Sequence, residues 1–392
     1  MELKKFVDFD QIDIAFKAKS DKALKKRHFI FSTMKWPWLV SVGTSLTKFS
    51  LSAGLPVKGL VKSTIFDIFC GGESLETCSD ACNELEHYGI GAIFDYSVEG
   101  EKTETGFDAT AEEVLRTIET ASKSDVMKFA AFKITGVGAF DLLAKIHAGE
   151  TLFTEESSAY DRIVKRVERI CALASELDVT VLIDAEETWI QKPIDDITID
   201  MMRKYNKEKA VIYYTFQMYC HAMLDNLQSL HKQAVSDGYI LGAKLVRGAY
   251  MEKERERAEE MGYLDPIQPT KQSTDDDFNA ACQYCIEHLN EIGLFAGSHN
   301  EESNYRLTLL MDEHNLQPDD QRVYFGQLYG MSDHISFNLA HGNYNVIKYV
   351  PYGPLKATIP YLIRRAAENT SVKGQSGREL TLVTKELKRR KS

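Results

Sequence analysis

The sequence predicts an α/β protein built as a (β/α)8 barrel. Eight short β-rich runs alternate with longer segments in which apolar residues recur at helical spacing. The chain of 392 residues is long enough for eight such units and a preceding helical region. The competing doubly wound sheet lacks its dinucleotide-binding fingerprint, because Gly89-Ile-Gly91 precedes its strand and Gly136-Val-Gly138 has no third glycine.

The β-then-α rhythm also sets the expected organisation along the chain. We expect strands at residues 90–94, 129–134, 180–183, 211–216, 242–246, 294–297, 323–327 and 346–349. The expected divisions are an N-terminal helical region packed on the barrel (1–85), the barrel itself (86–375) and a basic C-terminal tail (376–392).

Composition excludes several classes of function. The net charge is −11, and the one broad basic stretch is Lys385 to Lys391, which argues against nucleic acid as a partner. The sequence contains no run of about 18 apolar residues, so it predicts no membrane-spanning helix. The N-terminus resembles neither a secretory signal nor a transit peptide, and the seven cysteines are expected to be reduced, so we expect a cytoplasmic location.

A barrel of this kind carries its chemistry at the C-terminal ends of its strands. Nearly every predicted strand here ends in a group that can bind or ionise. Lys133 and Asp184 end adjacent strands, so we expect an ion pair that presents a cation to a ligand, or else a structural salt bridge. Metal binding at Asp184 to Glu187 is disfavoured, because His299 is the one histidine placed convincingly at a strand end.

The fifth and sixth strands end in segments suited to a flat or anionic ligand. Lys244 and Val246 point to one side of their strand, and Gly248 permits close approach to the backbone. A plain βα turn is the alternative. The hydroxyl of Ser298 and the imidazole of His299 are able to cradle a pyrophosphate or a ring edge, or else serve as capping and packing groups.

Residues 360–369 predict a helix that begins at Pro360, since proline suits the first helical turn. One narrow face of that helix carries Tyr361, Arg364, Arg365 and Glu368. Paired guanidinium groups close to a helix N-terminus suit a carboxylate or phosphate ligand. The alternative is a solvated amphipathic helix.

Six of these segments, in this order, resemble the proline dehydrogenase (proline oxidase) family of flavoenzymes. They are FKITG, LIDAEETW, KLVRGAY, GSHN, QLYGM and YLIRRAAEN, which span residues 132–369. The KLVRGAY segment is similar to the branch that includes animal mitochondrial enzymes. The resemblance implies a distorted TIM-type barrel that binds FAD at the strand C-termini, with the last helix over the barrel mouth.

The resemblance also assigns roles to residues. It implies catalytic roles for Asp184, Lys133 and Lys244. It implies that the substrate is bound by Lys133, Leu328, Tyr349, Tyr361, Arg364, Arg365 and Glu368. It implies that FAD is contacted by Ala185, Gln217, Lys244, Val246, Arg247, Gly248, Ala249, Ser298 and His299. Many bacterial members carry Arg in place of Lys244, and Lys supplies a cation there but no bidentate fork.

The implied reaction oxidises L-proline to Δ1-pyrroline-5-carboxylate by hydride transfer from C5 to flavin N5. Electrons pass on to a membrane quinone, and a separate chain acts on the product. The last six residues, LKRRKS, are expected to be a disordered, solvated end, and contact with anionic lipid is the alternative. If the tail contacts lipid, we expect a peripheral location at the inner membrane. If a transit peptide was removed, we expect a mitochondrial location.

Three other functions stay open at this point. Another FAD barrel, such as a methylenetetrahydrofolate reductase, shares the architecture but does not need the double-arginine helix. A hydroxyproline dehydrogenase is disfavoured because the bulk of Tyr349 should reject the hydroxylated ring. A proline-responsive DNA-binding regulator is disfavoured because the acidic N-terminus lacks a basic DNA-binding segment.

Overall fold

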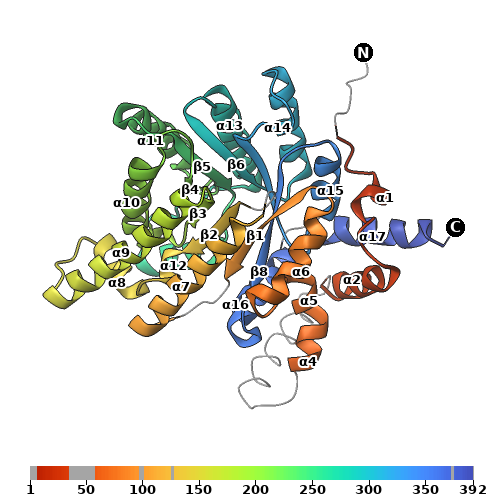
Figure 1. Ribbon diagram of the computed structural model, residues 1–392, viewed down its shortest axis with the longest axis horizontal. Helices are drawn as coiled ribbons and strands as arrows, with labels where there is room; N and C mark the ends of the chain where they lie inside the picture. Colours follow the sequence, from red (N-terminus) through yellow and green to blue (C-terminus); the bar gives the residue numbers. More distant parts are fainter. Residues whose placement is uncertain (1–6, 35–57, 97–100, 125–127, 372–374, 392) are drawn as a thin grey trace.

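A computed structural model describes residues 7–34, 58–96, 101–124, 128–371 and 375–391 (Figure 1). Eight parallel strands close into a barrel in chain order. They are β1 Ile90–Tyr96, β2 Phe129–Lys133, β3 Thr180–Asp184, β4 Ile212–Gln217, β5 Leu241–Val246, β6 Ile292–Gly297, β7 Val323–Leu328 and β8 Val346–Tyr352. Each strand overlaps one predicted run, so the predicted barrel is confirmed.

The register of the sheet brings the polar strand ends to one level. Lys133 lies directly opposite Asp184 across β2 and β3. Lys244 lies opposite Thr215 across β4 and β5, and Tyr349 lies opposite Leu328 across β7 and β8. Because parallel strands share a direction, all of these side chains reach the same mouth of the barrel.

Helices follow the first seven strands and cover the outside of the barrel. They are α7 Glu104–Ala121 after β1; η2 Ile134–Gly136, α8 Phe140–His147 and α9 Thr154–Glu176 after β2; α10 Thr188–Tyr205; α11 Met223–Asp237; α12 Met251–Met261 and α13 Lys271–Glu287 after β5; α14 Glu301–Glu313; and α15 Asp333–His341. Thr103 and Asn300 cap α7 and α14 by accepting hydrogen bonds from the backbone N–H groups of Gly106 and Ser303.

The barrel interior is packed with side chains and is not a pore. Ile93, Leu182, Tyr213, Phe295 and Tyr349 belong to one buried cluster inside the strands. A larger cluster fills the layer between the strands and the helices. Each fully buried side chain of this size contributes about 1.5–3 kcal/mol, so the rigidity of the mouth rests on this packing.

The segment before β1 completes the ring of helices. It contains α1 Ile12–Ala15, α2 Asp21–Met34, α4 Lys58–Val61, η1 Lys62–Phe66, α5 Asp67–Phe69 and α6 Leu75–Glu86. The buried face of α6, with Cys78 and Cys82, packs against β1 and β8. That is the place expected for a helix after β8. It is available because α16, Leu355–Ser371, crosses the barrel mouth instead.

Two predictions about the C-terminal part are wrong. The helix over the mouth begins at Leu355, so Pro360 lies inside it, and the two arginines sit near its middle and not at its N-terminus. The last residues, LKRRKS, are not a disordered, solvated end, because Leu387 to Arg389 belong to a further helix, α17 Gln375–Arg389. Leu382 and Val383 of α17 are fully buried.

The C-terminal prediction failed because α17 carries an apolar stripe whose packing partner lies far away in the sequence. Leu382 and Val383 pack on Ala15, Phe16 and Leu24 of the N-terminal segment. Consequently α17, and not the helix over the mouth, is the last helix of the chain. Among the helices that the structure describes, none is both long and apolar enough to cross a membrane.

Candidate active site

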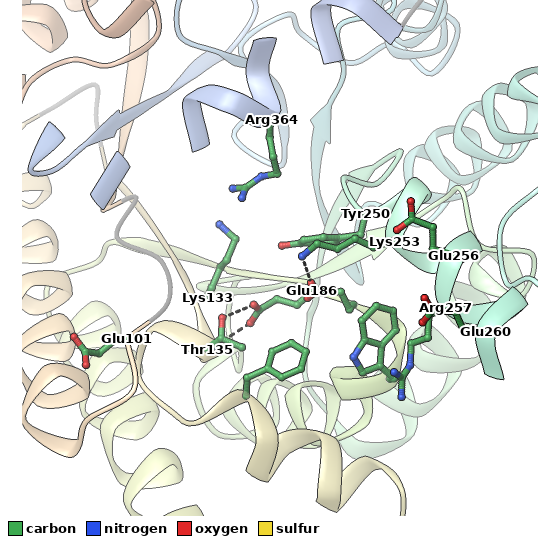
Figure 2. A pocket seen from close by; sticks show the side chains of 13 residues that line it. Glu101, Lys133, Thr135, Glu186, Tyr250, Lys253, Glu256, Arg257, Glu260 and Arg364 are labelled. Atoms are coloured by element: carbon green, nitrogen blue, oxygen red, sulfur yellow. Dashed lines mark hydrogen bonds and ion pairs between the residues drawn. The ribbon is translucent and has the colours of Figure 1, made fainter. Parts of the chain in front are cut away.

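A cavity of about 540 Å³ opens at the C-terminal ends of β2 and β3, under α16 (Figure 2). Its lining comes from the ends of β2 and β3, from the first turns of α8 and α10, from α12 and α16, and from Glu101 and Tyr250. The lining residues are Glu101, Lys133, Thr135, Phe140, Glu186, Glu187, Trp189, Tyr250, Lys253, Glu256, Arg257, Glu260 and Arg364. Of the predicted site residues, Lys133 and Arg364 therefore face one common cavity.

Asp184 is the centre of a charge cluster at the strand ends. The predicted contact with Lys133 is present at 3.9 Å between Nζ and Oδ2. A closer partner is Lys244, whose Nζ donates to Asp184 Oδ1 at 2.6 Å. The ammonium group of Lys244 also lies 4.7 Å from the ring centroid of Tyr349. Cation–π contact and the ion pair together fix Lys244, which is buried.

The face of α16 predicted to carry function meets the barrel mouth. Figure 2 shows Arg364 reaching down from α16 toward Lys133 and Glu186. Arg365 is buried, with its guanidinium 5.2 Å from the ring of Tyr361. Tyr361 packs in an apolar cluster that Leu328 borders. The side chain of Glu368 lies outside the described part of the structure.

The end of β5 presents backbone where a ligand can approach. Gly248 has a φ of +130°, and a Cβ atom there would lie 2.5 Å from the ring of Tyr219, so no other residue fits. Gly248 and Ala249 are exposed, and Val246 lies opposite Gln217. Ala185, directly after β3, is partly buried. Gln217 Nε2 donates to the backbone oxygen of Glu186 at 2.7 Å.

Arg247 is held by several partners on the outer side of the same strand end. It pairs with Asp275 at 2.6 Å and donates to Ser298 Oγ at 2.7 Å and to Ser303 Oγ at 2.9 Å. Its guanidinium also lies 4.4 Å from the ring of Phe278. Arg247 thus joins the loops after β5 and β6 and sets the position of Ser298.

His299 is neutral in this environment. Burial, and then the positive charge of Lys348, lower its pKa to about 3. Its Nε2 accepts the backbone N–H of Leu328 at 3.4 Å, so Nδ1 carries the proton and donates to Ser332 Oγ at 2.9 Å. One tautomer is therefore selected by the fold.

Sequence reasoning missed Glu186 as a site residue. Its buried carboxyl lines the cavity and accepts hydrogen bonds from Thr135, 3.0 Å from the backbone nitrogen and also from the hydroxyl. Burial raises the pKa of Glu186 to about 7, although those hydrogen bonds oppose the shift. The signal was its place in the polar segment Asp184 to Glu187, directly after β3.

The second missed group is the rim contributed by α12. Lys253 pairs with Glu187 at 2.8 Å, and the guanidinium of Arg257 lies 4.6 Å from the ring of Trp189. The charged sequence of α12, MEKERERAEEM, reads as an ordinary solvated helix. No local pattern identified it as one wall of the cavity.

Comparisons with known proteins agree with the resemblance read from the sequence. The family model described as proline dehydrogenase matches residues 78–378. The carbapenem antibiotics biosynthesis protein CarD of Pectobacterium carotovorum subsp. carotovorum is 38% identical over 333 residues, which is 85% of this chain and 86% of that protein. The mitochondrial proline dehydrogenase 1 of Dictyostelium discoideum is 33% identical, over 87% of this chain and 67% of its own.

Two other similar proteins are much longer than this chain. The human mitochondrial proline dehydrogenase 1 is 43% identical, over 61% of this chain and 40% of its own length. The solved structure of proline utilization A from Bdellovibrio bacteriovorus superposes with a TM-score of 0.73 at 20% identity, over 92% of this chain and 38% of that one. The latter shows a shared fold.

Proposed function

This chain belongs to the proline dehydrogenase family, the oxidoreductases that convert proline to Δ1-pyrroline-5-carboxylate, and we propose that it takes L-proline as substrate and FAD as cofactor. The observation that carries the proposal is the approach of Arg364 and Lys133 from opposite sides of one cavity, with Asp184, the partner of Lys244, 3.9 Å from Lys133. Two cations that converge on a small cavity suit the carboxylate of an amino acid.

The carboxylate of the substrate is held by Arg364, Arg365 and Lys133. The buried guanidinium of Arg365 is oriented by Tyr361, which limits its rotamers before substrate arrives. Glu368 is assigned to the same substrate site by family resemblance, since α16 carries it one turn further on.

The pyrrolidine ring is enclosed by Leu328, Tyr349 and Tyr361. Leu328 and Tyr349 are register neighbours, and Tyr361 packs in the cluster that Leu328 borders. An apolar wall of this kind binds the ring and excludes water from the C5 position. The buried Tyr349 ring leaves little room for a ring hydroxyl, so L-proline is preferred to hydroxyproline.

The substrate amine must be neutral so that its lone pair can assist departure of hydride from C5. Asp184, shared between Lys244 and Lys133, is proposed to face the amine and to accept its N–H. Lys244 holds that carboxylate in one rotamer, and Lys133 adds its charge at the carboxylate end of the substrate. Together these contacts fix the orientation of C5.

The residues present fit FAD. Tyr349 offers a buried hydroxyl with no hydrogen-bond partner among the described residues, and Gly248 offers exposed backbone. Gln217, Lys244, Val246, Arg247, Ala249, Ser298, His299 and Ala185 would complete the contacts. The chemistry that FAD supplies when bound is acceptance of the hydride at N5.

Membrane quinone is the proposed electron acceptor, and a separate pyrroline-5-carboxylate dehydrogenase chain the proposed consumer of the product. The working location is then cytoplasmic at the inner membrane, or mitochondrial where a transit peptide precedes the mature chain. Lipid contact through the C-terminal basic residues is less favoured, because Arg389 and Arg390 pair with the buried Glu386.

A direct test is the response of the flavin to substrate. Protein purified in the presence of FAD should be yellow, and anaerobic L-proline should bleach its visible flavin absorbance band, with on the order of one proline consumed per flavin. A colourless protein that takes up no added FAD would refute the flavoenzyme assignment. Bleaching by other amino acids but not by L-proline would refute the substrate.

A further inference from the structure

The C-terminal helix α17 reaches the loop that follows β7. Glu379 of α17 is 1% exposed, and its Oε1 accepts the backbone N–H of Ser332. Ser332 has a φ of +51°, in the left-handed region, and is the N-cap residue that directly precedes α15. This conformation is disfavoured for serine, so the hydrogen bond from Ser332 to Glu379 stabilises a turn that would otherwise relax.

Ser332 in turn contacts His299, which follows the neighbouring strand β6. The hydroxyl of Ser332 lies 2.9 Å from Nδ1 of His299, and Nε2 of the same ring accepts the N–H of Leu328 at 3.4 Å. A continuous series of hydrogen bonds thus runs from α17 through Ser332 and His299 to the end of β7. Both nitrogens of the imidazole are committed by it.

The carboxylate of Glu379 tolerates burial because cationic groups surround the turn. Lys348 donates to the carbonyl of Leu328 at 3.3 Å and to Asp333 at 2.9 Å, and Arg27 of α2 pairs with Asp333 at 2.7 Å. Nδ1 of His334 lies 3.9 Å from Glu379. The second oxygen, Oε2, has no hydrogen-bond partner among the described residues.

We propose that Glu379 is a positioning residue for His299, and that α17 acts through Ser332 to hold the imidazole and the end of β7 in the geometry that the site uses. The relevance of His299 to FAD rests on the proposed function. The claim that Glu379 positions His299 does not depend on the proposed function, because the hydrogen bonds involved lie within the chain itself.

The test compares two buried glutamates of the same helix. Glu379→Ala removes the acceptor for Ser332. Glu386→Ala is the matched control, because Glu386 is fully buried on α17 but pairs with Arg389 and Arg390 away from the turn. Long-range proton–nitrogen spectra of FAD-free protein labelled at histidine report the tautomer of His299, with His299→Gln identifying its signals.

We expect Glu379→Ala to abolish the Nδ1–H signature of His299 and to raise the dissociation constant of FAD about tenfold or more. Glu386→Ala should change neither. Glu379→Gln, which keeps an acceptor oxygen, should restore the signature. An unchanged His299 signal in Glu379→Ala, or an equal change in Glu386→Ala, overturns the proposal.

Two further measurements decide the role of Glu379 if the first variant does not fold or if the protein does not bind FAD. If Glu379→Ala does not fold, Ser332→Ala removes only the hydroxyl and should shift His299 in the same way, and an unshifted ring there also overturns the proposal. Failure of the wild-type protein to bind FAD would instead refute the proposed function, and the tautomer measurement would still decide the role of Glu379.

Discussion

Individual charges at the barrel mouth determine what the site can hold. Lys133, Lys244 and Arg364 face the acids Asp184 and Glu186. Asp184 neutralises Lys244 at 2.6 Å but lies 3.9 Å from Lys133, and burial keeps the pKa of Glu186 near 7. Lys133 and Arg364 bring two positive charges into this cavity from opposite sides, and this is where we propose that the substrate carboxylate binds.

The first prediction concerns the arginines of α16. Arg364→Met or Arg365→Met should raise KM for L-proline about 10–100-fold, since each removes a charge-assisted hydrogen bond to the carboxylate. FAD content should stay near that of the wild type. Steady-state kinetics measure the effect, with the exposed Arg306→Met of α14 as control. Near-normal KM in both α16 variants would contradict the assignment.

The second prediction concerns ring selectivity. Tyr349 is buried and packs beside Phe295 and Lys244, so its truncation opens space where C4 of the substrate ring would lie. Tyr349→Ser should raise the ratio of hydroxyproline to proline kcat/KM by about tenfold, a difference of roughly 1.4 kcal/mol. An unchanged ratio would show that Tyr349 does not set specificity.

Residue identities in the site were partly predictable. Strand-end positions and the arginine face of α16 follow from local periodicity, which is why Lys133 and Arg364 were singled out. The pairing of Asp184 with Lys244 was not, because 60 residues separate them and the register of three strands brings them together. Their roles in catalysis stay predictions until variants are measured.

At the scale of secondary-structure elements, the backbone conformation of the loop after β5 shapes the candidate site. Gly248 combines a φ of +130° with a backbone lying against Tyr219. Gly262 after α12 has a φ of +71° but nothing within 4 Å of a built Cβ. Gly262 therefore reports the cost of a left-handed helical conformation alone, whereas Gly248 combines a more extreme φ with a steric clash.

The third prediction uses that pair. Gly262→Ala should lower the free energy of unfolding by about 1 kcal/mol, as a left-handed alanine does. Gly248→Ala should cost about 2–4 kcal/mol and also weaken FAD binding, because the loop must shift away from Tyr219. Urea unfolding and FAD titration measure both. Equal effects at the two positions would mean that the close approach does not matter.

The C-terminal elements show where sequence reasoning fails. Proline at the sixth position of α16 looked like a helix start, and the preceding turn, Leu355 to Ile359, carries no strong capping signal. The last residues, LKRRKS, looked solvated, but the helix in which they begin also carries the buried Leu382 and Val383. The partner of that stripe is the N-terminal segment, so burial depended on tertiary structure.

At the scale of the whole molecule, ion pairs connect the N-terminal and C-terminal regions to the helices of the barrel. Glu301 of α14 pairs with Arg378 of α17 and His334 of α15, and Arg378 also reaches Asp10. Burial alone would raise the pKa of Glu301, but the hydrogen bonds from His334 and Arg378 outweigh it and hold the pKa at about 2.

The fourth prediction follows from that shift. A carboxyl whose folded pKa is depressed stabilises the protein above its unfolded value, 4.5 here, and loses that contribution as pH falls toward 2. The difference in unfolding free energy between wild type and Glu301→Gln should be largest above pH 4.5 and shrink on acidification. Urea unfolding of FAD-free protein across that range measures it, and a difference independent of pH would contradict the assignment.

The central claim is that the closed barrel and its crossing helix orient L-proline so that C5, and not the α-carbon, loses hydride. Anaerobic stopped-flow reduction with 5,5-dideuterated and with 2-deuterated L-proline tests it most directly. The account predicts a primary kinetic isotope effect on flavin bleaching from deuterium at C5 and none from deuterium at C2. A primary effect from C2, with none from C5, would contradict it.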